Sequence, residues 1–343
     1  MSKLKNILVT GGAGYIGSHT VVELIENGYT PVVLDDFRNS DPRIITGIET
    51  ITNSKVIVRK VDVCDRAKLA EVFREFNFLG IIHFAAYKAV GESVDKPLDY
   101  YRNNLLGLIN CLELALEYKT ENFVFSSSCT VYGEPEGEKV VSESSKTQNP
   151  KTPYGNTKAI GERIIEDVIA SGANIKILNL RYFNPVGAHE SILIGELPLG
   201  RPNNLLPILT QSAIGKLGTF VVNGNDYNTI DGTCVRDYIH VSDVADAHVK
   251  GMEWLENQKE PLSDVINIGT GKGSSVLEII HTFEEVSGMK LNWKFGERRQ
   301  GDVEEIYADV KKSRSVLNWK SQKTIKDAVI GAWKWELKLK NES

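Results

Sequence analysis

A run of hydroxyl side chains and a tyrosine–lysine pair are the residues of this chain that could carry chemistry. Residues 126–128 are Ser-Ser-Ser, and Tyr154 and Lys158 follow with a spacing that places both on one helix face. A tyrosine acts as a base near neutral pH only if its pKa falls from about 10 toward about 7, which needs roughly 4 kcal/mol of phenolate stabilisation. A nearby ammonium favours the phenolate. We therefore predict a proton-transfer site whose catalytic residues are Ser128, Tyr154 and Lys158.

A tyrosine and a lysine at this spacing also occur on helices that have no catalytic role, so the surrounding elements must decide. The apolar run 6–10 leads directly into a glycine-rich turn, and apolar residues at helical spacing continue to residue 27. Strand, glycine turn and helix occur in the order that a dinucleotide fold requires, with the phosphates at the helix N-terminus. The residues of this turn that we expect to contact the cofactor are Gly11, Gly14, Tyr15, Ile16 and Gly17.

A carboxylate after the next predicted strand indicates which dinucleotide binds. Residues 31–34 are apolar and end in Asp35 and Asp36, and Asp35 lies 18 residues after Gly17. An acidic residue at about this distance binds the ribose hydroxyls and repels a 2′-phosphate, so NAD is favoured over NADP. Arg38 lies close enough to keep NADP open, and the two aspartates could instead close a surface turn.

Strand and helix patterns continue to alternate along the first half of the chain. Apolar runs predict strands at 55–61, 80–86 and 122–125, and helical spacing is found at 66–76 and 103–118. The polar segment 133–151 is predicted to be a long surface loop, after which Thr152 and Pro153 suit the start of a helix. Because parallel strands carry their carboxyl ends to one rim of the sheet, residues 126–128 are expected beside the glycine turn.

This alternation predicts an α/β fold, a Rossmann-like doubly wound parallel sheet with a smaller α/β substrate domain. Residues 1–180 are assigned to the NAD-binding domain, and a segment near 237–255 is expected to return to it. Residues 181–343 are assigned to the substrate domain, because longer loops marked by Gly and Pro begin there. Within this half, a strand is predicted at 265–269 and helices at 275–286 and 325–339.

Composition excludes several classes of partner. The chain has 343 residues, 41% of them hydrophobic, and a net charge of -5 without a basic block, so nucleic acid is not an expected partner. No apolar run approaches the ~18 residues of a membrane span, and the N-terminus has no signal-peptide pattern. The four cysteines and six histidines are scattered, which predicts reduced thiols, no metal site and a cytoplasmic protein.

Several segments resemble the extended short-chain dehydrogenase/reductase family. The matching residues are Thr10-Gly11-x-x-Gly14-x-x-Gly17, Ser128 and Tyr154-x-x-x-Lys158. Longer blocks narrow the resemblance to the members of that family that are 4-epimerases of UDP-hexoses, and they lie at 9–19, 88–93, 126–133, 181–189, 202–205 and 235–241. The similarity covers essentially the whole chain.

The resemblance implies an NAD-dependent reaction that interconverts UDP-galactose and UDP-glucose through a transient 4-keto sugar. Tyr154 would take the proton of the 4-hydroxyl while NAD accepts a hydride from C4. Ser128 would hydrogen-bond to the 4-oxygen, and Lys158 would bind the nicotinamide ribose and lower the pKa of the tyrosine. Two alternatives stay open: a nucleotide-sugar dehydratase or oxidoreductase with the same base, and a non-catalytic NAD-binding protein.

The resemblance also assigns contacts outside the glycine turn. The cofactor contacts that it implies are Asp35, Asp62, Val63, Phe84, Ala85, Lys88, Asn103, Ser126, Tyr154, Lys158 and Phe183. The contacts to the UDP-hexose are Ser128, Asn184, Asn204, Leu205, Arg236, Arg299, Asp302 and Ile306. Guanidinium groups match the geometry of a pyrophosphate, which suits Arg236 and Arg299. Taken singly, Arg236-Asp237 could instead be an ordinary surface pair.

The chain departs from the family pattern at Asp36, Ala86 and Cys129, where the changes are compatible with NAD binding, and at Ile306. The last position resembles the pocket wall that limits the size of the sugar. A large aromatic side chain there would exclude an N-acetyl group on C2 and a small one would admit it, so acceptance of UDP-N-acetylhexosamines is a hypothesis. The resemblance finally implies a homodimer formed by the helices that contain Asn103 and Tyr154.

Overall fold

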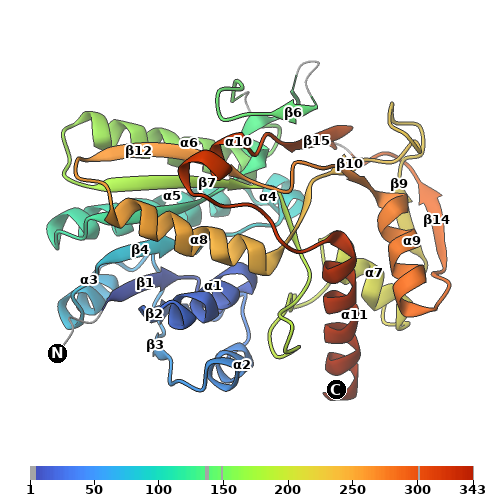
Figure 1. The fold of residues 1–343 in the computed structure, drawn as a ribbon, viewed down its shortest axis with the longest axis horizontal. Coiled ribbons are helices and arrows are strands. Elements are labelled where there is room, and N and C mark those ends of the chain that lie inside the picture. Colours follow the sequence, from blue (N-terminus) through green and yellow to red (C-terminus); the bar gives the residue numbers. More distant parts are fainter. Residues whose placement is uncertain (1–4, 136–138, 148–149, 300–301, 343) are drawn as a thin grey trace.

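The main element of the fold is a parallel sheet (Figure 1). The computed structural model describes residues 5–135, 139–147, 150–299 and 302–342, and within these ranges the sheet has seven strands in the order β12-β7-β5-β4-β1-β2-β3. The order reverses between β1 and β4, which is where doubly wound sheets bind ligands. The predicted Rossmann-like fold is therefore confirmed. The strands are β1 (Asn6–Thr10), β2 (Thr30–Leu34), β3 (Ile57–Arg59), β4 (Gly80–His83), β5 (Asn122–Ser128), β7 (Lys176–Tyr182) and β12 (Leu262–Ile268).

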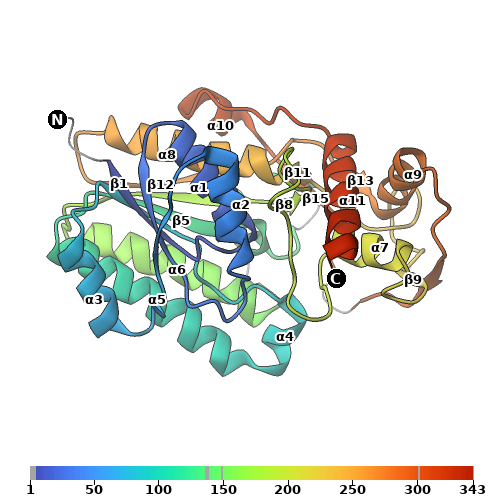
Figure 2. The same ribbon diagram turned by 90° about the horizontal axis from the view of Figure 1, so that it is seen from below.

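Helices cover both faces of this sheet (Figure 2). The helices on one face are α1 (Tyr15–Glu26), α2 (Arg43–Thr52) and α8 (Val241–Glu256). The other face carries α3 (Arg66–Glu75), α5 (Pro97–Glu117) and α6 (Pro153–Ala170), with the short helix α4 (Val90–Asp95) beside them. Strands covered on both faces have apolar central residues, which explains the apolar runs 7–9, 81–82 and 123–125 in β1, β4 and β5.

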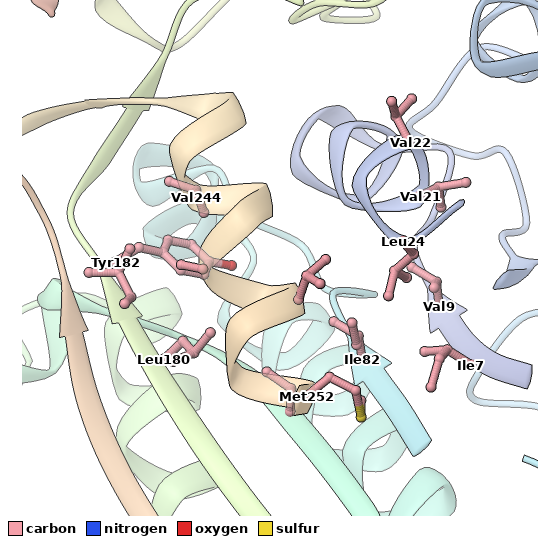
Figure 3. Close-up of a cluster of buried hydrophobic side chains, with 14 of the residues drawn as sticks. Ile7, Val9, Val21, Val22, Leu24, Ile82, Leu180, Tyr182, Val244 and Met252 are labelled. Atoms are coloured by element: carbon pink, nitrogen blue, oxygen red, sulfur yellow. The ribbon is translucent and has the colours of Figure 1, made fainter. Parts of the chain in front are cut away.

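The core between the sheet and its first helical layer is shown in Figure 3. Val9 and Ile82 from the strands pack with Leu24 of α1 and Val244 of α8 in one fully buried cluster. Leu8 belongs to the cluster on the opposite face, because neighbouring strand residues point to opposite sides. The close packing of α1 against α8 holds a segment from late in the sequence beside the helix that follows the glycine turn.

Some boundaries differ from the predictions. The predicted loop 133–151 contains a short strand, β6 (Val140–Val141), which pairs with β15 (Glu305–Ala308) and buries Val141. The helix predicted from Asn103 begins at Pro97, where proline occupies the first turn. β12 lies in the large sheet, although only the segment near 237–255 was expected to return to it from the second half of the chain. The division of the chain at residue 180 stays a prediction, and residues 1–4, on which the signal-peptide expectation rests, lie outside the described residues.

A smaller unit of helices and strands adjoins the carboxyl rim of the sheet (Figure 1). A small sheet has the order β13-β10-β15-β6, and two strand pairs, β11-β8 and β14-β9, accompany it. The strands not yet located are β8 (Asn184–Val186), β9 (Phe220–Asn223), β10 (Val235–Arg236), β11 (Tyr238–His240), β13 (Ser274–Ser275) and β14 (Trp293–Gly296). The helices of this unit are α7 (Leu205–Ala213), α9 (Val276–Ser287) and α11 (Ile325–Glu342), whereas α10 (Lys311–Val316) lies beside β12 of the large sheet.

This unit has its own buried cluster, in which Phe283 of α9 packs edge-on against Trp333 of α11. Trp333 and Trp335 are both buried. Within the described ranges, no helix is long and apolar enough to cross a membrane.

Candidate active site

Strand β5 and helix α6 bring the three predicted catalytic residues together. Ser128 is the last residue of β5, and α6 begins at Pro153 after Thr152, whose hydroxyl accepts a hydrogen bond from the Gly155 amide at 3.3 Å. This cap fixes the first turn, so Tyr154 and Lys158 lie in the first two turns. The Lys158 ammonium lies 6.0 Å from the centroid of the Tyr154 ring.

Lys158 is anchored to the strand that carries the serines. Its Nζ donates to the Ser126 carbonyl at 2.6 Å and lies 5.0 Å from the Phe125 ring centroid. The side chain is 4% exposed, and burial lowers the pKa of Lys158 to about 7, although the Glu162 carboxylate acts in the opposite direction. The amine can therefore gain or lose a proton near neutral pH.

Burial acts on Tyr154 as well. It raises the pKa of this phenol to about 12, while a hydrogen bond with Ser128 acts in the opposite direction. The sequence argument expected a pKa below the ordinary value, so the direction produced by the chain itself is the reverse. The cause is desolvation, which penalises a phenolate more than the hydrogen bond with Ser128 compensates. A phenolate at this site therefore needs a positive charge nearby.

A buried ion pair is linked to the helix and the strand that carry the candidate catalytic residues. Arg181 of β7 donates from Nε and Nη2 to both carboxylate oxygens of Glu162 on α6, at 2.9 and 2.5 Å. Both side chains are 6% exposed, and Ser127 also donates to Glu162. Arg181 donates further to the Tyr132 hydroxyl at 3.1 Å, which donates to Asn267 of β12 at 2.6 Å. The network therefore ties α6 to three strands of the sheet.

Sequence reasoning missed this network. The available signal was the position of Glu162, which follows Lys158 by four residues and so shares its helix face.

The glycine turn has the geometry that a dinucleotide requires. Gly11 has a φ of +69, and a Cβ added there would lie 2.8 Å from the Ala85 amide nitrogen. A Cβ on Gly17 would lie 2.3 Å from the Gly11 carbonyl oxygen, so a side chain is excluded at both positions. Gly14 is the N-cap of α1 and has no side chain that could accept hydrogen bonds from the first amides of the helix. These amides can therefore donate to a phosphate. These residues fit the diphosphate of NAD.

Asp35 at the end of β2 supports this turn. Its carboxylate accepts from the Ala13 amide at 3.0 Å and from the Ser40 hydroxyl at 2.7 Å, and the residue is 9% exposed. The alternative that the aspartates only close a surface turn is therefore wrong for Asp35, because its carboxylate faces the glycine turn.

Arg38 is held by two carboxylates. Its guanidinium forms ion pairs with Asp36 and Asp62 and donates to the Tyr87 hydroxyl at 2.9 Å and to Asn103 Oδ1 at 3.4 Å. Two aspartates balance its single positive charge, so Arg38 does not present an unpaired cation to a 2′-phosphate. This arrangement fits NAD and removes the support that Arg38 gave to NADP.

The other cofactor candidates follow the carboxyl ends of the strands. Phe84 and Ala85 follow β4, and Phe183 follows β7 with 3% of its surface exposed. Lys88 lies farther along the loop after β4 and forms an ion pair with Glu196. The side chains of Ile16 and Val63 pack against the two core clusters, and the Val63 carbonyl accepts from Asn110. Some of the predicted cofactor contacts therefore lie at the carboxyl rim of the sheet, and others have side chains that pack in the hydrophobic core.

The candidates for a diphosphate clamp converge on one carboxylate. Arg299 donates to Asp302 Oδ1 from Nε and Nη2 at 3.1 and 2.5 Å, and Arg236 Nη2 lies 3.7 Å from the same oxygen. The exposed fractions of the side chains are 61% for Arg299 and 15% for Arg236. The structure thus brings these three residues together and leaves Arg299 accessible.

The remaining substrate candidates lie on several elements. Asn184 begins β8, and Asn204 precedes Leu205 at the start of α7, with its side chain donating to Glu196. Ile306 is 4% exposed and packs in an apolar cluster with Val131 and Phe183. In the register between β10 and β15, Ile306 is the partner of Arg236, so the candidate wall residue lies beside a candidate clamp residue.

The interpretation of Arg236-Asp237 as a surface pair is wrong. Asp237 is fully buried and accepts hydrogen bonds from Thr270, Gly271 and the Ala308 amide. Burial raises the pKa of this carboxyl, and the hydrogen bonds from Thr270 oppose the shift. Asp237, the neighbour of Arg236, therefore connects the loop that follows β12 with strand β15.

The NAD dependent epimerase/dehydratase family matches residues 7–269. The chain is similar to UDP-glucose 4-epimerase 2 of Arabidopsis thaliana, with 46% identity over 96% of this chain and 95% of the relative. It is also similar to the crystal structure of a UDP-glucose-4-epimerase from Stenotrophomonas maltophila with bound NAD and formylated UDP-arabinopyranose, with a TM-score of 0.95, 43% identity, and coverage of 99% and 100% of the two chains. The UDP-glucose 4-epimerase from Bifidobacterium longum in complex with NAD+ and UDP gives a TM-score of 0.94, 42% identity, and coverage of 98% and 100%.

The depressed pKa of Lys158 predicts a pH-dependent stability for the nucleotide-stripped protein. Above about pH 7 the folded state has lost a proton that the unfolded lysine keeps to about pH 10, so the free energy of unfolding rises with pH in this window. The contribution of one such group is at most about 1.4 kcal/mol per pH unit. Urea unfolding of the parent and Lys158→Met between pH 7 and 9.5 measures it, and equal slopes for both proteins would contradict the assignment.

The buried ion pair predicts a large loss of stability in Glu162→Ala. This change leaves the Arg181 guanidinium buried without its partner, which costs about 3–5 kcal/mol in the free energy of unfolding. Glu166→Ala is the matched control, because Glu166 lies on the same helix and its exposed pair with Arg163 contributes less than about 1 kcal/mol. Chemical denaturation of both variants tests the difference, and similar losses would show that the buried pair has no special role.

Proposed function

The chain belongs to the NAD dependent epimerase/dehydratase family, and we propose that it works as a UDP-glucose 4-epimerase, interconverting UDP-galactose and UDP-glucose with NAD as its cofactor. The observation that carries this proposal is the convergence of Ser128, Tyr154 and Lys158 at the rim that also holds the glycine turn. The near full-length similarity to UDP-glucose 4-epimerases supports the same function.

The chain's own residues would move and hold the proton. When bound, NAD would supply a reversible hydride acceptor for C4 of the sugar, so that the redox state is restored at the end, and a positive charge that favours the phenolate. The Tyr154 oxygen takes the proton from the sugar 4-hydroxyl, and Ser128 hydrogen-bonds to the same oxygen. Lys158, whose pKa of about 7 suits proton exchange near neutrality, stabilises the phenolate. Return of the proton to the 4-oxygen after the sugar has turned completes the cycle with no net proton change.

The nucleotide must be held firmly while the hexose turns over. Arg236 and Arg299 would bind the diphosphate of the UDP-sugar, and Asp302, which already orients both guanidinium groups, would bind the uridine ribose. Asn184 would contact the sugar or phosphate, and Asn204 and Leu205 the diphosphate region. This division places the tight contacts on the nucleotide and leaves the hexose free to present either face.

Ile306 would form the wall that limits the sugar. It packs among apolar side chains next to Phe183 and is shorter than an aromatic residue. We expect this wall to admit an N-acetyl group on C2, so that the UDP-N-acetylhexosamine pair is also a substrate.

We also propose a homodimer formed through α5 and α6, which pack against each other. Leu98, Leu106 and Ile109 of α5 are exposed by 73%, 40% and 37%, and a second subunit would cover this apolar surface. We propose a cytoplasmic location, supported by the four free cysteines, Cys64, Cys111, Cys129 and Cys234.

Incubation with UDP-galactose in the absence of added cofactor tests the function. The purified protein should form UDP-glucose without a lasting absorbance change at the wavelength of reduced nicotinamide. Tyr154→Phe should lower kcat by about 10²–10⁴-fold, because the phenol oxygen that takes the proton is lost, while the binding of NAD stays largely intact. A dehydrated or oxidised sugar product, or full activity of the variant, would refute the proposal.

Turnover of both sugar pairs tests the role of Ile306. The parent should epimerise UDP-N-acetylglucosamine as well as UDP-glucose, whereas Ile306→Tyr should lose at least about tenfold in kcat/KM for the N-acetylated pair alone. Because position 306 is buried, the thermal stability of the variant should be measured in parallel. Absence of N-acetyl turnover in the parent would disprove the assignment of this wall.

A further inference from the structure

Glu196 connects the two halves of the site. It lies in the loop between β8 and α7, and 11% of its side chain is exposed. One carboxylate oxygen, Oε1, accepts from Lys88 Nζ at 3.1 Å and from Asn204 Nδ2 at 2.5 Å. Lys88 is a candidate contact of the cofactor and Asn204 of the substrate. A single carboxylate oxygen therefore joins both subsites.

The backbone of Glu196 is held by helix α11. Trp335 of α11 donates from Nε1 to the Glu196 carbonyl at 2.9 Å, and its ring is 4% exposed. The ring packs so closely on Gly195 that a Cβ there would lie 2.8 Å from it, and Gly195 forms a β-bridge with Ala188. The carboxylate thus projects from a rigid support.

Lys88 is oriented from two sides. Its ammonium lies 5.7 Å from the centroid of the Tyr15 ring, and the Tyr15 hydroxyl donates to the Gly187 carbonyl at 2.7 Å. Tyr15 belongs to the glycine turn, so the lysine lies between this turn and Glu196. An ion pair with a half-exposed lysine contributes little to stability, which makes a role in geometry the better explanation for the pair.

The charge of Glu196 also needs an explanation. A carboxylate near two diphosphates would repel both unless a cation balances it, and Lys88 is that cation. A neutral residue could hold Asn204 without this cost. The carboxylate is therefore suited to holding an ammonium and an amide at the same time.

We propose that Glu196 is a positioning residue that couples the two subsites, holding Lys88 toward the cofactor diphosphate and Asn204 toward the diphosphate of the UDP-sugar. This inference rests on the proposed function. It adds a residue between the subsites that touches neither reacting atom.

Three variants separate the contributions of Glu196. Glu196→Gln keeps the shape of the side chain and an acceptor for Asn204 but removes the charge that holds Lys88. Glu196→Ala removes both. Glu190→Gln is the matched control, because Glu190 lies in the same loop, has an 80% exposed side chain and pairs only loosely with Lys323 at 3.7 Å. Far-UV circular dichroism and tryptophan fluorescence confirm that each variant is folded.

Glu196→Ala should weaken UDP binding, measured by titration calorimetry, by about tenfold and raise the KM for UDP-galactose similarly, with kcat changed less than about threefold. Glu196→Gln should give an intermediate loss, and Glu190→Gln should match the parent. Lys88→Met should raise the UDP dissociation constant less in the Glu196→Ala background than in the parent, because the coupling is already broken.

Unchanged UDP binding in Glu196→Ala would overturn the proposal, as would tighter binding in Glu196→Gln, which would identify Glu196 as a purely repulsive neighbour. Additive effects of the Lys88 and Glu196 changes would equally refute coupling. If Glu196→Ala does not fold, the same cycle with Glu196→Gln decides. Calorimetry with UDP needs no turnover, so an inactive parent would refute the epimerase while leaving this test intact.

Discussion

The bidentate contact between Glu162 and Arg181 is the interaction on which the site geometry depends. A buried charge is tolerated only when its partner and its remaining hydrogen bonds are in place, so α6 can approach the sheet in one orientation. Tyr154 and Lys158 are carried by this same helix, and Ser127, which donates to Glu162, directly precedes Ser128. The distance from the phenol to the serine is therefore set by a polar contact that takes no part in the chemistry.

The parts of the fold that the sequence predicts correctly depend on short-range physics. Apolar runs, the glycine turn before α1 and the Thr152 cap are each determined by a few neighbouring residues, and all three are confirmed. Convergence of Ser128 with the glycine turn required one further rule, that parallel strands share a carboxyl rim. The family resemblance then supplied residue identities, but the roles of the individual side chains remain proposals.

The features that escaped prediction are long-range. Local sequence places Val140–Val141 in a polar loop, but pairing with β15 makes it a strand. Local sequence also allows Asp237 to be a surface carboxylate, but in the structure it accepts hydrogen bonds from three amides that are distant in sequence. The direction of the Tyr154 pKa shift depends on burial, which no local pattern specifies. Sequence spacing alone identified which groups could exchange a proton, but the pKa values of these groups depend on how they are packed.

The position of β12 and α11 in the sequence has a consequence for biosynthesis. β12 completes the large sheet beside β7, and Trp335 of α11 supports the loop that carries Glu196. Most strands of the sheet emerge from the ribosome long before β12 and α11. One side of β7 therefore stays without a partner strand in the nascent chain. Such an edge can pair with strands of other chains, so the interval before β12 emerges favours association between nascent chains.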